Sequence, residues 1–155
     1  MSETPRKVIA SNRKARHDYT LEDQIEAGLV LVGSEIKSIR DGHVNLKEGY
    51  VSEQNGELWL LGVHISEYEQ AGKWGHEPLR PRKLLLHKKE IARLISRIRE
   101  RGYTIVPTLL YLKNGRAKVE IAVAKGKREY DKRQAMSERD NQREIDRVLK
   151  EQDRG

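Results

Sequence analysis

The sequence has no cysteine and no phenylalanine, and it holds only two tryptophans and four prolines in 155 residues. Without cysteine, the chain can form neither a disulfide framework nor a catalytic thiolate. No apolar run approaches the roughly 20 residues that a membrane-spanning helix needs, and the N-terminus lacks the apolar stretch of a signal peptide. These absences predict a cytoplasmic protein that has no membrane partner.

Motifs of the common enzyme classes are missing as well. No glycine-rich loop runs into Lys-Ser or Lys-Thr as in a phosphate-binding loop, and there is no Gly-x-Ser-x-Gly elbow for a serine nucleophile. The histidines occur singly, without metal-ligand spacing; they are His17, His43, His64, His76 and His87. We therefore expect no catalytic residue, no metal and no cofactor. An unusual nuclease assembled from distant residues is kept as an alternative.

Positive charge is what the chain has in excess, with 31 Lys and Arg against 24 Asp and Glu and a net charge of +7. Such a bias favours nucleic acid as the partner. The aromatic signature of an RNA-recognition motif and the Gly-x-x-Gly loop of a KH domain are absent, which disfavours a sheet that stacks unpaired bases. No helix-turn-helix or zinc-finger pattern points to DNA. The composition thus predicts contact with the phosphates and sugars of a folded RNA.

Composition also divides the chain into three segments. Residues 1–16 read as a basic N-terminal arm, and residues 17–124 carry the patterns of a folded barrel. Residues 125–155 have so few apolar side chains that burial cannot offset the entropy lost on ordering. We expect this basic tail to be disordered in the free protein and to become helical, from about Ser137 onward, on an anionic partner.

The middle segment predicts short antiparallel strands. Asn-Gly pairs at residues 55–56 and 114–115 predict two hairpins, because both residue types tolerate positive φ. The predicted strands cover residues 29–39, 50–53, 58–63, 103–112 and 116–124. The first of these is expected to bend at Gly33 and to follow a turn at residues 27–28. Residues 19–27 are interpreted as a further strand, with one helical turn as the alternative. A small closed or nearly closed barrel accounts for this pattern.

One long helix is predicted over residues 87–101. Its apolar residues Ile91, Leu94, Ile95 and Ile98 form a single stripe, and Gly102 follows where a left-handed residue ends a helix. The basic residues of this helix form either a ligand contact or only a solvated face. The predicted fold is thus mainly β with flanking helices.

Six short motifs occur in order along almost the whole chain. They are residues 11–17 (SNRKARH), 26–29 (EAGL), 33–40 (GSEIKSIR), 82–86 (RKLLL), 102–107 (GYTIVP) and 124–127 (AKGK), the last leading to an Asp-Lys-Arg motif. Their combination resembles the bacterial SsrA-binding proteins, or small protein B, which partner transfer-messenger RNA (tmRNA). Several independent motifs at matching spacing make this resemblance far more specific than any single one.

The resemblance implies an oligonucleotide-binding (OB) type β-barrel that binds the tRNA-like domain of tmRNA. With elongation factor Tu and GTP, held indirectly through the tmRNA, such proteins deliver it to stalled ribosomes for trans-translation and peptide tagging. The tail would enter the decoding centre of the small subunit and the empty mRNA channel and become helical. A generic OB-fold translation factor that binds ribosomal RNA directly is the alternative.

The resemblance also carries site residues. The family's RNA-binding positions fall on Asn12 and His17 as donors, Glu26 as an acceptor from a base amino group or 2′-hydroxyl, and Leu85 as a surface for an exposed base. To these we add four phosphate contacts: Arg13, Arg16, Lys83 and Lys118.

In the tail, the implied ribosome contacts are Lys125, Lys127, Arg128, Tyr130, Asp131, Lys132 and Arg133. Tyr130 stands in place of a histidine. A tyrosine can still stack on a base, but it does not become cationic near neutral pH, so a role that needs imidazolium does not carry over.

Overall fold

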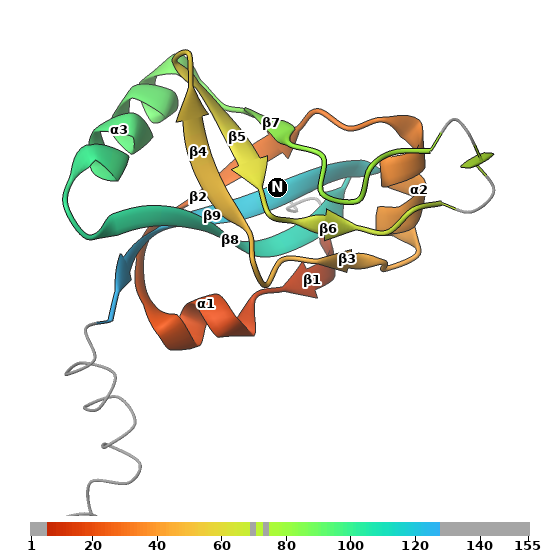
Figure 1. Ribbon diagram of the computed structural model, residues 1–155, viewed down its shortest axis with the longest axis horizontal. Coiled ribbons are helices and arrows are strands. Elements are labelled where there is room, and N and C mark those ends of the chain that lie inside the picture. The colour runs from red at the N-terminus through yellow and green to blue at the C-terminus, as the bar shows by residue number, and fades with distance from the viewer. Residues whose placement is uncertain (1–5, 69–70, 73–74, 128–155) are drawn as a thin grey trace, which may run out of the picture. The chain divides into compact units, whose positions relative to one another are not determined.

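The computed structural model describes residues 6–68, 71–72 and 75–127. Its main element is a seven-stranded sheet in the order β1-β8-β9-β2-β7-β5-β4 (Figure 1). In that order the strands are Arg6–Ser11, Tyr103–Lys113, Arg116–Gly126, Tyr19–Leu29, Arg82–Leu85, Glu57–Leu61 and Tyr50–Gln54. A second sheet pairs β3 (Val44–Asn45) with β6 (His64–Ile65). The helices are α1 (Arg13–Asp18), α2 (Gly33–Arg40) and α3 (Lys88–Arg99).

The sheet curls so that β4 packs against β8, and β3 packs against β1. Alternate side chains of each strand therefore meet inside. Leu58 and Leu60 of β5, and Val119 and Ile121 of β9, are among the fully buried residues of this core. The arrangement confirms the expected mainly β, OB-fold-like barrel with flanking helices.

Both predicted hairpins are confirmed. In the β4–β5 hairpin, Asn55 and Gly56 have φ of 55° and 77°, and in the β8–β9 hairpin Asn114 and Gly115 have φ of 53° and 72°. Two successive positive φ values match the right-handed twist of the flanking strands. The second hairpin fixes a long ladder, which runs from Tyr103 paired with Lys125 to Lys113 paired with Arg116.

The α3 helix also matches its prediction. Leu94 is fully buried, and the other three residues of the predicted stripe pack on the same core. Its arginines form ion pairs with acidic residues of β2 and β4. The pairs are Arg93–Asp23 at 3.9 Å, Arg97–Glu22 at 2.7 Å and Arg99–Glu53 at 3.6 Å. Much of the helix's positive charge is therefore matched by acids of the barrel beneath it.

The strand predicted over residues 29–39 is wrong. β2 continues through Gly28 to Leu29, where a turn had been predicted, and Gly33–Arg40 is the helix α2. The apolar run at residues 29–32 concealed the change from the two-residue period of a strand to the 3.6-residue period of a helix. The helical period is visible in the burial of Glu35 and Ile39, which are four residues apart. The Glu35 carboxylate accepts the Val32 N–H at 2.9 Å and so satisfies a donor at the helix start.

The arm predicted over residues 1–16 is instead built into the fold from Arg6 onward. β1 pairs with β8 from Arg6 opposite Lys113 to Ser11 opposite Leu109, and α1 follows directly. The partner strand β8 lies about a hundred residues away from β1 in the sequence, so no local pattern predicts that β1 is a strand. The strands β3 and β6 were also missed because two residues are too few to form a pattern. The predictions for residues 128–155 lie outside the described part of the chain.

Candidate nucleic-acid interface

A basic face forms where the strands β1, β8, β9, β2 and β7 turn side chains away from the core. Residues opposite each other in a ladder share a face of the sheet. The ladder places Tyr111 opposite Lys118, and Lys113 opposite both Arg116 and Arg6. We call this side of the sheet the outer face, and its members are Arg6, Glu26, Lys83, Leu85, Lys113, Arg116 and Lys118, together with Tyr111, whose side chain is buried among them.

Glu26 is an acidic member of the outer face. Its Oε2 accepts a hydrogen bond from the Tyr111 hydroxyl at 2.6 Å and lies 3.5 Å from Lys113 Nζ. The hydrogen bond from Tyr111, the Lys113 ammonium and the Lys118 ammonium hold the pKa of Glu26 below its ordinary value and outweigh the opposing effect of burial. An acceptor that stays ionised near neutral pH suits an amino group or a 2′-hydroxyl.

Beside Glu26, the outer face offers an apolar surface next to a cation. Gly28 of β2 pairs with Leu85 of β7, whose side chain is exposed. A Cβ added at Gly28 would lie 3.1 Å from Leu85 Cβ and 3.6 Å from Lys118 Nζ. The missing side chain therefore lets Leu85 and Lys118 come together over the β2 backbone. This geometry suits a flat base next to a phosphate.

Lys83 continues the same face along β7, two residues before Leu85. Its ammonium forms an ion pair with Glu57 at 3.0 Å, and both side chains are partly exposed. An exposed ion pair of this kind contributes little to the stability of the fold. Lys83 can therefore exchange Glu57 for a phosphate at low cost.

The α1 helix lies at the other end of the outer face. Ala15 packs on Val106 and Ala124, and Ala124 shares a face of β9 with Lys118 because their positions differ by six, an even number. Six residues of strand span about 20 Å, so α1 does not belong to the Glu26 cluster. Arg13, Arg16 and His17 are exposed on α1, and the His17 ring lies 3.0 Å from Asp18.

Asn12, predicted as a donor to RNA, is 2% exposed. Its amide nitrogen donates to the carbonyls of Leu46 at 3.1 Å and Pro107 at 2.9 Å, and its oxygen accepts the Ala15 N–H at 3.0 Å. Both amide hydrogens are therefore used inside the fold. Asn12 caps α1 and ties it to the barrel; it does not offer a donor at the surface.

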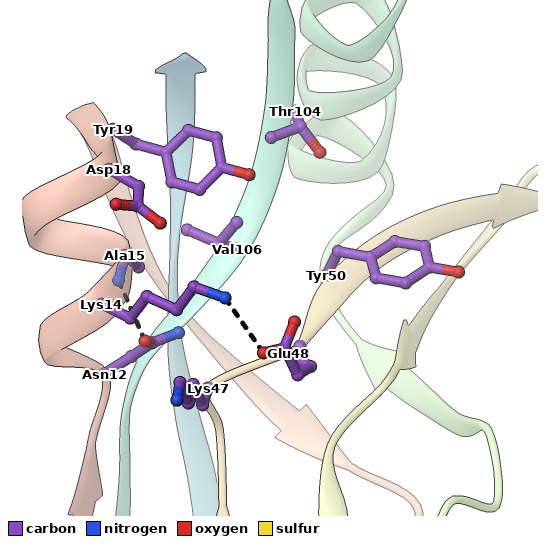
Figure 2. A pocket seen from close by; sticks show the side chains of 11 residues that line it. Asn12, Lys14, Ala15, Asp18, Tyr19, Lys47, Glu48, Tyr50, Thr104 and Val106 are labelled. Carbon is purple, nitrogen blue, oxygen red and sulfur yellow. Dashed lines mark hydrogen bonds and ion pairs between the residues drawn. The ribbon is translucent and has the colours of Figure 1, made fainter. Parts of the chain in front are cut away.

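Next to α1 lies a pocket of about 420 Å³ that the sequence did not reveal (Figure 2). The rings of Tyr19 and Tyr50 stand on opposite walls, and the ion pair of Lys14 with Glu48 at 3.0 Å crosses the space between α1 and the loop before β4. Lys47 also lines it. Aromatic walls combined with ammonium groups can hold an unpaired nucleotide.

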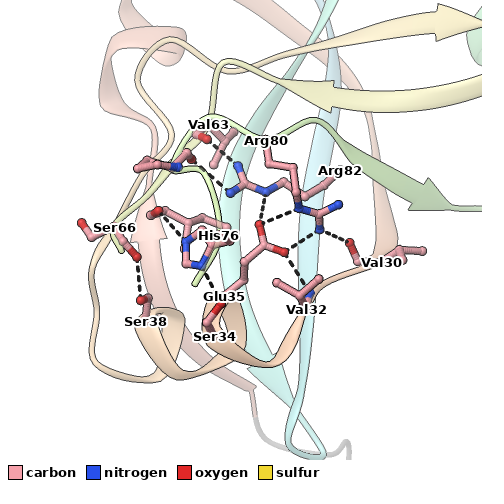
Figure 3. Close-up of polar contacts among 12 residues, drawn as sticks. Val30, Val32, Ser34, Glu35, Ser38, Val63, Ser66, His76, Arg80 and Arg82 are labelled. Carbon is pink, nitrogen blue, oxygen red and sulfur yellow. Dashed lines mark hydrogen bonds and ion pairs between the residues drawn. The ribbon is translucent and has the colours of Figure 1, made fainter. Parts of the chain in front are cut away.

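A second polar cluster is buried and structural (Figure 3). Glu35 pairs with Arg80 at 2.5 Å and with Arg82 at 2.6 Å, and Arg82 also donates to the carbonyls of Val63 and Pro78. Burial alone would raise the pKa of Glu35, but the hydrogen bonds from Arg80, Val32 N–H and Arg82 together hold it below its ordinary value. These charges satisfy one another and tie α2 to β7.

His76 completes this cluster. One ring nitrogen lies 2.7 Å from the Ser34 hydroxyl and the other 2.9 Å from the carbonyl oxygen of Ile65. In the described residues no three side chains of the metal-binding types gather into a site. Nor is any described helix long and apolar enough to cross a membrane.

The structure thus brings Glu26, Leu85 and Lys118 together, with Lys83 beside them. It places Arg13, Arg16 and His17 at the far end of the face. Arg6, Tyr111, Lys113 and Arg116 were missed as site residues. The Asn-Gly turn alone pairs Tyr111 with Lys118 and Lys113 with Arg116, so the hairpin register could have found three of them. Lys125 and Lys127 are described, whereas the other predicted tail residues, from Arg128 to Arg133, are not.

Comparison with known proteins gives a consistent result. The SmpB protein family model matches residues 9–151. An SsrA-binding protein of Roseiflexus castenholzii is 59% identical over 149 residues, which cover 96% of this chain and 94% of the relative. One from Geobacillus thermodenitrificans is 58% identical over 145 residues, 94% of each chain. A solved chain described as "tmRNA-SmpB: a journey to the center of the bacterial ribosome" is 40% identical, with a TM-score of 0.69, over 83% of this chain and 94% of its own length.

Proposed function

The chain belongs to the SmpB family of SsrA-binding proteins, and from that premise we propose that it binds the tRNA-like domain of tmRNA and brings it to stalled ribosomes for trans-translation. The observation that carries this proposal is the Glu26–Leu85–Lys118 cluster on a basic face. It combines an ionised acceptor, an exposed apolar surface and a cation, which are the three chemistries that a folded RNA with an accessible base requires.

On the outer face the residues have different tasks. Lys118 and Lys83, helped by Arg6, Lys113 and Arg116, contact phosphates and supply most of the affinity. Glu26 accepts a hydrogen bond from a base amino group or a 2′-hydroxyl. Because a carboxylate repels any phosphate that comes too near, Glu26 also rejects RNAs whose shape does not present that donor.

At the α1 end, Arg13, Arg16 and His17 supply further contacts to phosphates or base edges. Asn12 fixes the position of the helix that carries these residues, since it caps α1 and anchors it to the carbonyls of Leu46 and Pro107. We therefore assign Asn12 an indirect part in RNA binding, through the position of α1.

The tail has a separate part. Residues 125–155 enter the decoding centre of the small subunit and the mRNA channel, where Lys125, Lys127, Arg128, Tyr130 and the motif Asp131-Lys132-Arg133 contact ribosomal RNA. Elongation factor Tu with GTP joins indirectly through tmRNA. The protein acts in the cytoplasm as an RNA-binding factor and not as an enzyme.

A gel-shift comparison tests the proposal. Full-length protein should bind the tRNA-like domain of tmRNA at least about tenfold more tightly than elongator tRNA or fragments of ribosomal RNA, since tenfold in the dissociation constant is the energy of one good polar contact. Equal affinity for all three RNAs would overturn it in favour of a generic translation factor. RNA breakdown with a divalent metal would indicate a nuclease.

Deletion of residues 128–155 tests the division of labour. RNA affinity should stay nearly unchanged, whereas peptide tagging on stalled ribosomes should be abolished. A large loss of affinity for the tRNA-like domain would show that the tail binds tmRNA itself.

A further inference from the structure

We propose that Tyr111 is a positioning residue for RNA recognition: its hydroxyl holds Oε2 of Glu26 so that the carboxylate presents its other oxygen to the RNA in one fixed orientation. This inference rests on the proposed function, in which Glu26 accepts a hydrogen bond from the bound RNA. It adds the device that makes such an acceptor selective.

The contacts of Glu26 fall on one side of its carboxylate. The Tyr111 hydroxyl donates to Oε2 at 2.6 Å, a length typical of a hydrogen bond from a hydroxyl to a charged oxygen. Lys113 Nζ lies 3.5 Å from the same atom. Both of these contacts are made to Oε2, and no hydrogen bond to Oε1 is found among the described residues, so Oε1 is the atom left for a ligand.

Without Tyr111, the carboxylate would lack a fixed direction. Glutamate is a flexible side chain that loses appreciable entropy when it is ordered. Its other neighbours, Lys113 and Lys118, end in ammonium groups, which act as mobile point charges. Fixing the carboxylate before the RNA arrives lowers the entropic cost of binding. It also keeps Oε1 in one place, so that only a donor at the matching position is accepted.

Tyr111 is itself firmly held. It is 1% exposed, and the Arg6 guanidinium lies 4.8 Å from the centre of its ring. Burial and the hydrogen bond to Glu26 raise the pKa of Tyr111 to about 12. The hydroxyl therefore stays protonated, and remains a donor, near neutral pH.

A conservative substitution tests the proposal in the full-length protein. Tyr111→Phe keeps the ring and removes only the hydroxyl. The probes are the tRNA-like domain of tmRNA and a random-sequence RNA of the same length. We expect about tenfold weaker binding of the tRNA-like domain, the size of one lost charge-assisted hydrogen bond, and less than about twofold change for the random RNA.

Tyr103→Phe is the matched control. Its ring lies on the same strand and also carries an arginine, Arg97, at 4.6 Å. The control should bind both RNAs as the wild type does. A Tyr111→Phe variant that loses equal affinity for both RNAs would show a merely structural tyrosine and would overturn the proposal.

A double-mutant cycle separates this proposal from the proposed function. Tyr111→Phe should cost little further affinity in a Glu26→Ala background, because no carboxylate is left to orient. Additive losses overturn the positioning role. If Glu26→Ala weakens cognate binding but Tyr111→Phe does not, the positioning role alone fails. If Glu26→Ala has no effect, the recognition role of Glu26 fails and the positioning role with it.

Discussion

Two glutamates of this protein, Glu26 and Glu35, are both paired with cations, yet the structure gives them opposite tasks. Glu35 is fully buried, and both its oxygens are bound by Arg80, Arg82 and the backbone. Glu26 is partly exposed, and its contacts gather on one oxygen. Charge alone therefore does not mark a binding residue; what distinguishes one is an acceptor left open at the surface.

The largest expected difference between the two acids is in stability. Glu35→Ala leaves the guanidinium of Arg82, whose side chain is 1% exposed, buried without its partner. Removing one member of a buried ion pair costs about 3–5 kcal/mol, so urea unfolding should show a loss of that order. Glu48→Ala removes an exposed partner of Lys14 and serves as the control. A loss below about 1 kcal/mol for Glu35→Ala, the range of exposed pairs, would contradict the structural role.

The same carboxylate predicts a pH dependence. The pKa of Glu35 is lowered in the fold, so its contribution to stability is complete above the unfolded value of about 4.3 and is lost as the pH falls through the lower folded value. The free energy of unfolding should therefore fall more steeply between about pH 5 and pH 2 for the wild type than for Glu35→Gln. Parallel slopes would show that Glu35 is not ionised in its network.

Asn12 extends the comparison. The sequence predicted it to bind RNA, as Glu26 is proposed to do, whereas in the structure it is buried and has a structural role, as Glu35 has. Asn12→Ala removes the cap of α1 and leaves two buried carbonyls without the donor they have in the fold, which should lower the free energy of unfolding by about 2–4 kcal/mol. Faster hydrogen exchange in α1 would locate the loss. Asn45→Ala, which removes a single exposed contact to the Lys47 N–H, is the matched control. If the Asn12→Ala variant were as stable as the wild type but bound RNA weakly, the predicted direct contact between Asn12 and RNA would be supported instead.

The features that the sequence predicted depend on neighbours along the chain. The Asn-Gly hairpins and the apolar stripe of α3 are local, and both were found. The α2 helix was missed because the apolar run before Gly33 suggested a continuing strand, while the arginines that pair with Glu35 lie more than forty residues away. For the same reason, the burial of Asn12 and the hydrogen bond of Tyr111 to Glu26 could not be predicted, since each joins residues 34 to 95 positions apart.

Glu26→Ala should show the reverse of Glu35→Ala. Stability should fall by about 1–3 kcal/mol, because the buried Tyr111 hydroxyl loses its acceptor, and so by less than for Glu35→Ala. Binding of the tRNA-like domain should weaken about tenfold, the value of one charge-assisted contact, while random RNA of equal length is nearly unaffected. Glu53→Ala, at an acid that pairs with Arg99, controls for loss of negative charge. Equal weakening on both RNAs would remove Glu26 from the selectivity of the site.

The smallest effect on RNA affinity is expected for Lys118→Ala. Lys118 is proposed to contact a phosphate through its charge, whereas Glu26 is proposed to make a selective contact. A lysine that meets one phosphate adds affinity without regard to sequence, so both RNAs should bind a few-fold more weakly and their ratio should stay constant. The slope of log affinity against log salt should fall by about 0.7–0.9, the value for one phosphate. Lys37→Ala on α2, which removes a cation away from the outer face, should leave the slope unchanged. An altered RNA ratio with an unchanged slope would mean that Lys118 acts through Glu26, whose charge it helps to hold, and not through a phosphate.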